Sequence, residues 1–314
     1  MLSYLRNIGL IVLVIVAIKA EGQTCCTGSA PITGAVRVSS LEANQWQFTF
    51  SYDYNNISDL IQDNVKLNDN YLSRTTTTLL LQSSYGIGKG FGISMLLPIV
   101  QHTETVLIAT DKSILMNTDL GDLTIFGQWQ YQLNSTSSLL FGAAIKLPTG
   151  ETNAKDQSDL FILPPTLQAG TGSFDYIFLI QGQKSMRFRK SLVIQQSFTY
   201  RLNTLSTSFA SHDNYQFGNE FYAITSFADQ LVTGSLMHTP SLSINIRYAG
   251  KNTIEQFVDP NSGGWWINLR PGWGINLTPK LNLAIIYEVP LHRNLNGFQL
   301  TTSYRVIGVV NFTL

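Results

Sequence analysis

Apolar and polar residues alternate in twelve stretches of this chain, and the connections between the stretches alternate between long and short. The clearest stretch covers about residues 45–55, where Trp46, Phe48 and Phe50 fall on one face. Gln47 and Thr49 fall on the other. Because successive side chains of a strand point to opposite faces, this period of two predicts strands with one apolar face.

The other stretches repeat this alternation at intervals along the chain. They cover about residues 74–86, 90–101, 123–131, 139–147, 174–180, 192–200, 217–227, 236–248, 265–275, 281–289 and 304–314. A tilted strand crosses a bilayer with about ten residues. Outer-membrane barrels have short periplasmic turns and long outer loops. We therefore predict an all-β fold, a transmembrane antiparallel β-barrel of about 12 strands, with short periplasmic turns and long extracellular loops.

The strand count also predicts an orientation. With an even count and both chain ends periplasmic, every long connection lies outside, including the one through Asn294 and Gly297. Aromatic residues near the strand ends, among them Trp46, Trp129 and Trp265, suit the membrane interfaces. Closure is required physically, because an open edge in lipid would leave backbone groups unpaired.

Composition supports a wall with one lipid face and one wet face. Only 13% of the residues are charged, against about 25% in an ordinary soluble domain, and the mean hydropathy is +0.07. The formal net charge is zero, which argues against a nucleic-acid partner. The expected partners are outer-membrane lipids, the barrel-assembly machinery and a small-molecule solute.

The chain begins with the pattern of an export signal. Arg6 precedes an apolar run, Ile8–Ile18, which is too short to span a membrane, and small residues follow at Ala20 and Gly22. We predict a signal peptide over 1–22, an N-terminal periplasmic segment or plug over 23–43, and the barrel over 44–314. This organisation predicts location in the outer membrane of a Gram-negative bacterium.

The two cysteines, Cys25 and Cys26, are adjacent and follow the predicted cleavage site. Vicinal cysteines are weak candidates for a soft metal or a strained disulfide. The alternative is a simple N-terminal segment at the barrel mouth. No cofactor is predicted.

The polar face of the strands carries charged residues, mostly in the half of each strand nearer the long loops. A charged side chain facing lipid at mid-membrane costs roughly 2–4 kcal/mol, so these residues are expected to point into the barrel. Two interpretations are open: a charged constriction that selects solutes, or a set of ion pairs that fills a narrow lumen. The candidates are Asp53, Asp122, Lys146, Asp175, Arg201, Glu220, Arg247, Arg270, Glu288 and Arg305.

Catalysis has little support in the sequence. A barrel phospholipase needs a serine and a histidine on the outer face of neighbouring strands. The histidines His102, His212 and His292 fall in or beside predicted outer loops, and His238 falls near an inner turn. We therefore predict no enzyme, and the phospholipase-like reading is the weakest alternative.

Three motifs resemble a known family, the outer-membrane transporters associated with the meta-pathway of phenol degradation. They are Gly121-Asp122-Leu123-Thr124, Lys146-Leu147-Pro148-Thr149-Gly150-Glu151 and Leu163-Pro164-Pro165-Thr166-Leu167-Gln168-Ala169-Gly170-Thr171-Gly172-Ser173-Phe174-Asp175. Two further stretches fit, Tyr215-Gln216-Phe217-Gly218-Asn219-Glu220 and Leu295-Asn296-Gly297. Within this family, the chain is similar to a branch that is common in Bacteroidetes-type bacteria, where a Cys-Cys pair near the mature start also occurs. The resemblance implies a barrel that transports hydrophobic compounds.

The third motif forms a long outer loop with candidate roles for Pro164, Pro165, Gly170 and Gly172. It either folds inward as a constriction or makes a rigid corner. The sequence thus predicts a channel or transporter for small solutes, with a closed structural or ligand-binding surface barrel as the alternative. The oligomeric state is not predicted.

Overall fold

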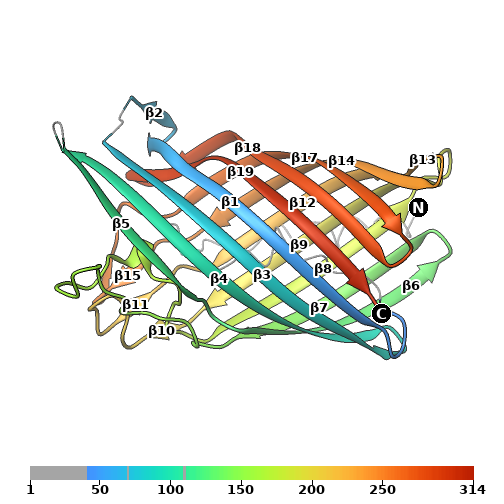
Figure 1. Ribbon diagram of the computed structural model, residues 1–314, viewed down its shortest axis with the longest axis horizontal. Coiled ribbons are helices and arrows are strands. Elements are labelled where there is room, and N and C mark those ends of the chain that lie inside the picture. The colour runs from blue at the N-terminus through green and yellow to red at the C-terminus, as the bar shows by residue number, and fades with distance from the viewer. Residues whose placement is uncertain (1–40, 69–70, 109–110) are drawn as a thin grey trace, which may run out of the picture.

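The computed structural model describes residues 41–68, 71–108 and 111–314. Within these residues, twelve long strands pair antiparallel with their neighbours along the chain, and the first pairs with the last to close a barrel (Figure 1). The predicted fold is therefore confirmed. The wall strands are β1 (Trp46–Gln62), β3 (Leu72–Gly88), β4 (Phe91–Ile108), β6 (Thr124–Asn134), β7 (Ser137–Lys146), β8 (Asp175–Ser185), β9 (Leu192–Asn203), β12 (Glu220–Asp229), β14 (Leu236–Ala249), β17 (Gly264–Thr278), β18 (Leu281–Leu295) and β19 (Phe298–Thr313).

Short elements lie in the connections between the wall strands. One end of the barrel, here called the outer end, carries most of them, and the other, called the periplasmic end, has short turns and the C-terminus (Figure 1). At the outer end are β2 (Val65–Leu67), β5 (Asp111–Leu120), the 3-10 helix η1 (Pro165–Leu167), β10 (Leu205–Ser206), β11 (Tyr215–Gln216), β15 (Thr253–Ile254) and β16 (Phe257–Val258). At the periplasmic end is β13 (Leu231–Thr233).

Two local predictions are corrected by the structure. The last outer connection was expected to be long, but it is the two-residue turn Asn296–Gly297, where Gly297 has a φ of 60° that favours glycine. Several strands also run further outward than predicted; β1 reaches Gln62 and β4 reaches Ile108. Beyond the lipid, a strand needs no apolar face, so the alternation that marks its membrane part fades there.

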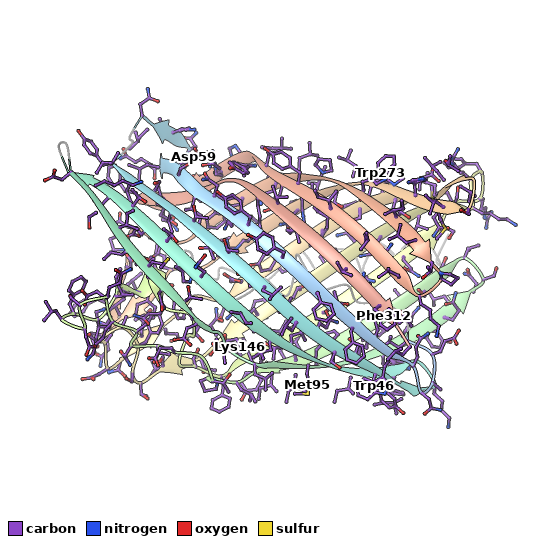
Figure 2. All side chains as sticks on the ribbon, viewed as in Figure 1. Trp46, Asp59, Met95, Lys146, Trp273 and Phe312 are labelled. Atoms are coloured by element: carbon purple, nitrogen blue, oxygen red, sulfur yellow. The ribbon has the colours of Figure 1, made fainter. Side chains whose placement is uncertain are left out.

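The outer surface of the wall is apolar. Phe50, Met95 and Ile285 are about half exposed to what would be lipid, and Figure 2 shows Met95 and Trp273 on the outside of the barrel. Aromatic rings gather towards both ends of this surface. The Trp46 and Tyr85 rings are 4.8 Å apart near the periplasmic end, and those of Tyr248 and Trp265 are 4.5 Å apart towards the outer end. This arrangement of an apolar band between aromatic girdles suits a bilayer.

The hydrogen-bonded ladders of the wall differ in length. The closing seam between β1 and β19 is paired from Gln47 to Gln62. The pairing of β4 with β6 covers only Phe91–Leu96, because the outer half of β4 pairs with β5 instead.

The outer connections are joined to one another by hydrogen bonds. The loop after β7 bonds to the loop after β9 through the Ala210 amide and the Thr152 carbonyl (2.8 Å). That loop pairs with the next through β11 and β15. The series ends at the turn between β18 and β19, where the Asp63 amide donates to the Gly297 carbonyl (3.3 Å) across the seam. We call this set of linked connections the collar.

One residue expected on the lipid face lies in the collar. Phe217 is the first apolar residue of the predicted stretch 217–227, whose alternation would direct it to the lipid, but it precedes β12 and is buried. Its ring lies 5.0 Å from that of Phe209 and 4.6 Å from that of Tyr215. The three rings form a small apolar core that holds the loop between β9 and β12 together.

The predicted signal peptide, residues 23–40 of the predicted N-terminal segment, and Cys25 and Cys26 lie outside the described residues. In the part of the chain that the structure describes, no helix is long and apolar enough to cross a membrane.

Candidate functional site

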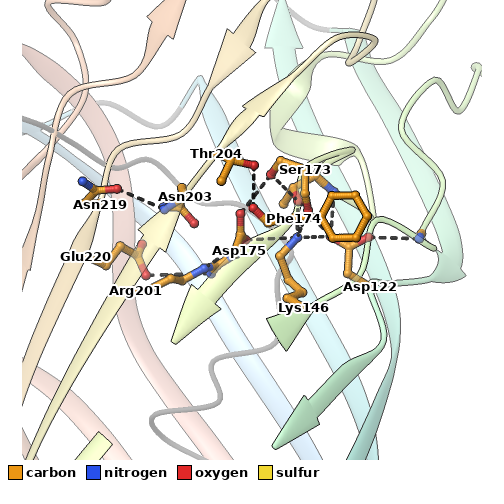
Figure 3. Close-up of polar contacts among 12 residues, drawn as sticks. Asp122, Lys146, Ser173, Phe174, Asp175, Arg201, Asn203, Thr204, Asn219 and Glu220 are labelled. Carbon is orange, nitrogen blue, oxygen red and sulfur yellow. Dashed lines mark hydrogen bonds and ion pairs between the residues drawn. The ribbon is translucent and has the colours of Figure 1, made fainter. Parts of the chain in front are cut away.

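A chain of ion pairs crosses five neighbouring strands on the inner face of the barrel, near its outer end. Figure 3 shows the part of it from Asp122 to Glu220. The series begins where Lys146, the last residue of β7, contacts the carboxylates of Asp122 and Asp175, the latter at 3.0 Å. Asp175 accepts from Arg201 on β9 at 2.5 Å. We call this series, from Asp122 to Arg247, the ionic chain.

The ionic chain continues through Glu220, the first residue of β12. The carboxylate of Glu220 lies 3.9 Å from Arg201 and 2.7 Å from Arg247 on β14, and it also accepts the Tyr222 hydroxyl at 2.8 Å. The Arg247 guanidinium then stacks 4.8 Å above the ring of Trp266. Each carboxylate of the ionic chain thus contacts at least one cation, as a buried charge requires.

The other four predicted charged residues pair on the opposite part of the wall. Arg270 on β17 contacts Glu288 on β18 at 3.1 Å. Arg305 on β19 donates through Nε to Asp53 on β1 at 2.7 Å. The structure therefore places the ten predicted residues, five basic and five acidic, on the inner face, each of them in an ion pair.

The loop between β7 and β8 is anchored on the ionic chain. Lys146 donates to the Thr171 hydroxyl and to the Ser173 carbonyl (3.1 Å). Asp122 accepts the amides of Thr171 (2.9 Å) and Gly150 (3.0 Å). The return of the loop into β8 is therefore fixed by the same charges that line the wall.

The proline and glycine candidates shape this loop. Pro164 precedes η1 and Pro165 is its first residue, and η1 packs against β4. Gly170 touches Gly150 so closely that a Cβ there would lie 2.6 Å from the Gly150 carbonyl carbon. Gly172 has a φ of 66°, which favours glycine.

Three side chains in the returning half of this loop are buried. Leu163, Leu167 and Gln168 are at most 1% exposed, and the Leu167 carbonyl accepts from Asn117 on β5 at 2.9 Å. Gln168 closes the loop on itself through the Ala154 amide (2.8 Å). The segment is thus a packed part of the barrel interior and not a free surface loop.

An apolar layer lies one step towards the periplasmic end from the ionic residues, and sequence reasoning missed it. Ile177 follows Asp175 by two positions, and Ile307 follows Arg305 in the same way. They belong to one cluster of buried inner-face residues, Leu80, Leu96, Phe126, Ala144, Ile177, Ile307 and Val309. The available signal was a loss of alternation, as in Leu79-Leu80-Leu81, where both faces are apolar.

Ion pairs of the outer rim were also missed. Arg74 on β3 faces Glu104 on β4 at 3.8 Å. Asp59 on β1 binds Arg293 on β18 at 2.8 Å and Lys66 at 2.6 Å. Arg74 is the first residue of the stretch 74–86, and the other residues lie beyond the stretches where alternation is visible.

One half-buried carboxylate orders the tip of the β7–β8 loop. Asp156 accepts the Ser158 hydroxyl and the amides of Phe161 (3.0 Å) and Leu160 (2.9 Å). Chiefly through the Ser158 hydroxyl and then the Phe161 amide, these hydrogen bonds lower the pKa of Asp156 to about 2.

The histidines are spread over the barrel. His102 Nδ1 lies 3.0 Å from the Thr76 hydroxyl, and the ring of His238 lies 5.7 Å from that of Trp273. Among the described residues, no serine hydroxyl is hydrogen-bonded to a histidine ring.

The closed wall, its apolar belt and its charged inner face define a twelve-stranded barrel of the outer-membrane type within the described residues. Solved structures of other proteins have the same fold. The crystal structure of the COG4313 outer membrane channel from Pseudomonas putida F1 superposes with a TM-score of 0.72 at 14% identity, over 88% of this chain and 97% of that one. At this identity the match shows the fold.

Two further matches have lower TM-scores. The β domain of the Bordetella autotransporter BrkA has a TM-score of 0.48 at 11% identity, over 87% of this chain and 100% of that one. The NanC porin has a TM-score of 0.45 at 11% identity, over 85% and 100%. No protein-family model and no curated protein matches the sequence.

Proposed function

We propose that this chain is a channel or transporter through which small solutes cross the outer membrane of a Gram-negative bacterium. The observation that carries the proposal is the polar lining of the barrel. Ser51 Oγ, Asn55 Oδ1 and Gln82 Oε1 are buried inside the wall, and no described residue bonds to them. Buried polar atoms are normally hydrogen-bonded to protein or water, so this lining fits an interior that takes water and polar solutes.

The membrane assignment rests on the outer face. Its apolar band lies between two aromatic girdles, and the closed ladder leaves no wall strand with a free edge among the described residues. Outer-membrane lipids and the barrel-assembly machinery are the partners that such a wall requires. The Pseudomonas putida protein with the same fold is described as an outer membrane channel, which agrees with this function.

The layered interior supports small solutes with both polar and apolar parts. A solute that enters from outside meets the ionic chain first and the apolar layer around Phe126 and Ile177 next. This order agrees with the motif resemblance to transporters associated with phenol degradation, and we extend the proposal to aromatic or other weakly polar compounds of that kind.

Reconstitution tests the proposal directly. Purified barrel in planar bilayers is expected to give single-channel conductance, and liposomes that contain it are expected to take up small solutes. Absence of both would refute transport.

Charge selectivity tests whether solutes pass the ionic chain. Arg247→Ala removes a cation whose side chain is 24% exposed and leaves Glu220 with Arg201 and the Tyr222 hydroxyl. The reversal potential in a salt gradient is expected to shift towards cation selectivity. Lys112→Ala, on the exposed surface of β5, removes the same charge away from the ionic chain and serves as the matched control.

One observation favours a second function, that of a closed structural or ligand-binding surface barrel. The ten predicted inner charges are all paired, as expected of a lumen that is filled. In that case Arg201→Ala and Arg247→Ala would lower stability and leave conductance absent.

A further inference from the structure

A cleft opens at the outer rim of the wall, beside the ionic chain and outside the lumen. It has a volume of about 230 Å³ and lies where β9, β12 and β14 meet the collar. Drug-sized ligands occupy pockets of about 300–1,000 Å³, so this cleft suits a smaller, single-ring molecule.

Three aromatic residues line the cleft. Phe221 on β12 is the register partner of Tyr200 on β9 and also of Tyr248 on β14, so the three residues lie at one level of the wall. Flat aromatic surfaces of this kind bind other rings by offset or edge-to-face packing.

The lining of the cleft also includes hydrogen-bond donors. Lys251 follows β14 and is half-buried, and no described residue forms an ion pair or hydrogen bond with its ammonium group. Asn219 accepts the Asn203 amide through Oδ1 at 3.0 Å, which leaves its amide NH₂ directed to other partners. A ligand that carries an anion would satisfy both groups.

The acidic residue of the cleft does not repel an anion. Glu220 is held by Arg247 at 2.7 Å and by the Tyr222 hydroxyl at 2.8 Å, with Arg201 at 3.9 Å. The negative charge of Glu220 is therefore compensated by residues inside the wall. The charge that the cleft presents to a ligand is the positive charge of Lys251.

We propose that this cleft is a binding site for small monocyclic aromatic carboxylates, with the ring against Tyr200, Phe221 and Tyr248 and the carboxylate on Lys251. The site goes beyond the proposed passage of solutes, because binding at the rim does not require an open lumen.

The test is ligand-observed NMR on the full barrel in lipid nanodiscs, with benzoate as the probe. Benzoate is expected to bind, whereas benzyl alcohol, which lacks the charge, and benzylamine, which reverses it, bind at least about tenfold more weakly. Charge-assisted hydrogen bonds are strong enough for this difference. Equal binding of the three probes would overturn the proposal.

Variants locate the site. Lys251→Gln is expected to weaken benzoate binding about tenfold or more, and Tyr200→Leu is expected to weaken it by removing a ring. Lys112→Gln is the matched control and is expected to leave binding unchanged. Folding of each variant is verified by heat-modifiable migration on gels. Unchanged binding in folded Lys251→Gln would refute the site.

The outcome is separable from that of the proposed function. Conductance without benzoate binding refutes only the cleft site, and benzoate binding without conductance or solute uptake refutes only transport.

Discussion

Replacement of Lys146 by methionine is the sharpest test of the ionic chain. The Lys146 side chain is 3% exposed, and its ammonium contacts Asp122 and, at 3.0 Å, Asp175. At an effective dielectric constant of about 20, unit charges about 3 Å apart attract by roughly 5–6 kcal/mol. The variant keeps the aliphatic length and removes this attraction.

The remaining contacts moderate the loss. Asp175 keeps Arg201 at 2.5 Å, and Asp122 keeps the amides of Thr171 and Gly150. Removal of one partner from a buried pair costs about 3–5 kcal/mol. We expect the free energy of unfolding of Lys146→Met to fall by an amount in that range.

The assay is guanidinium unfolding in phospholipid vesicles, followed by tryptophan fluorescence and extrapolated linearly to zero denaturant. Lys155→Met is the matched control, because the Lys155 ammonium pairs with Asp159 at 2.8 Å while 49% exposed. A surface pair contributes about 0–1 kcal/mol. Adding Asp122→Asn to Lys146→Met should restore part of the stability by neutralising the stranded carboxylate. A loss below about 1 kcal/mol for Lys146→Met would refute the reasoning.

Three further predictions concern the loop and the wall. Gly170→Ala forces a Cβ to 2.6 Å from backbone and should lower stability in the same unfolding assay, whereas at Gly127 the nearest atom would be 3.9 Å away and alanine should be tolerated. Ile244→Arg, on the lipid face midway along β14, should cost roughly 2–4 kcal/mol of folding stability in bilayers, and Val232→Arg, on the exposed short strand β13, should not; equal losses would contradict the lipid assignment. The pKa of Asp156 is depressed to about 2, so its carboxylate orders the loop tip above the unfolded pKa and loses this effect as pH falls from about 4 to about 2. Hydrogen exchange of the amides it accepts should show protection at pH 5 that Asp156→Ala abolishes, and protection retained in the variant would refute the assignment.

Alternation alone was sufficient to predict the wall. A residue such as Arg201 lies between Tyr200 and Leu202, both exposed on the lipid face, so its inward direction follows from the period of two. The inner charges were predicted for the same reason, because charged side chains are excluded from the lipid face and must therefore point to the barrel interior.

What the sequence could not supply has physical reasons as well. Leu80 and Leu96 point inward although their neighbours are also apolar. In a run that is apolar on both faces, the sequence pattern does not show which residues face the interior. Arg74 and Glu104 pair beyond the lipid, where neither face is selected for apolarity. The contact of Gly170 with Gly150 depends on how two loop segments pack, which no local pattern encodes.

The unequal ladders have a mechanical consequence. The seam between β1 and β19 is paired from Gln47 to Gln62, with a local irregularity between Asn56 and Asp59, and at its periplasmic end the Leu314 amide donates to the Trp46 carbonyl at 2.8 Å. The join of β4 and β6 holds over only six residues of each strand. Under lateral tension the barrel should therefore open between β4 and β6 and not at the seam. The pairing of the first strand with the last is thus not the weakest pairing of the wall.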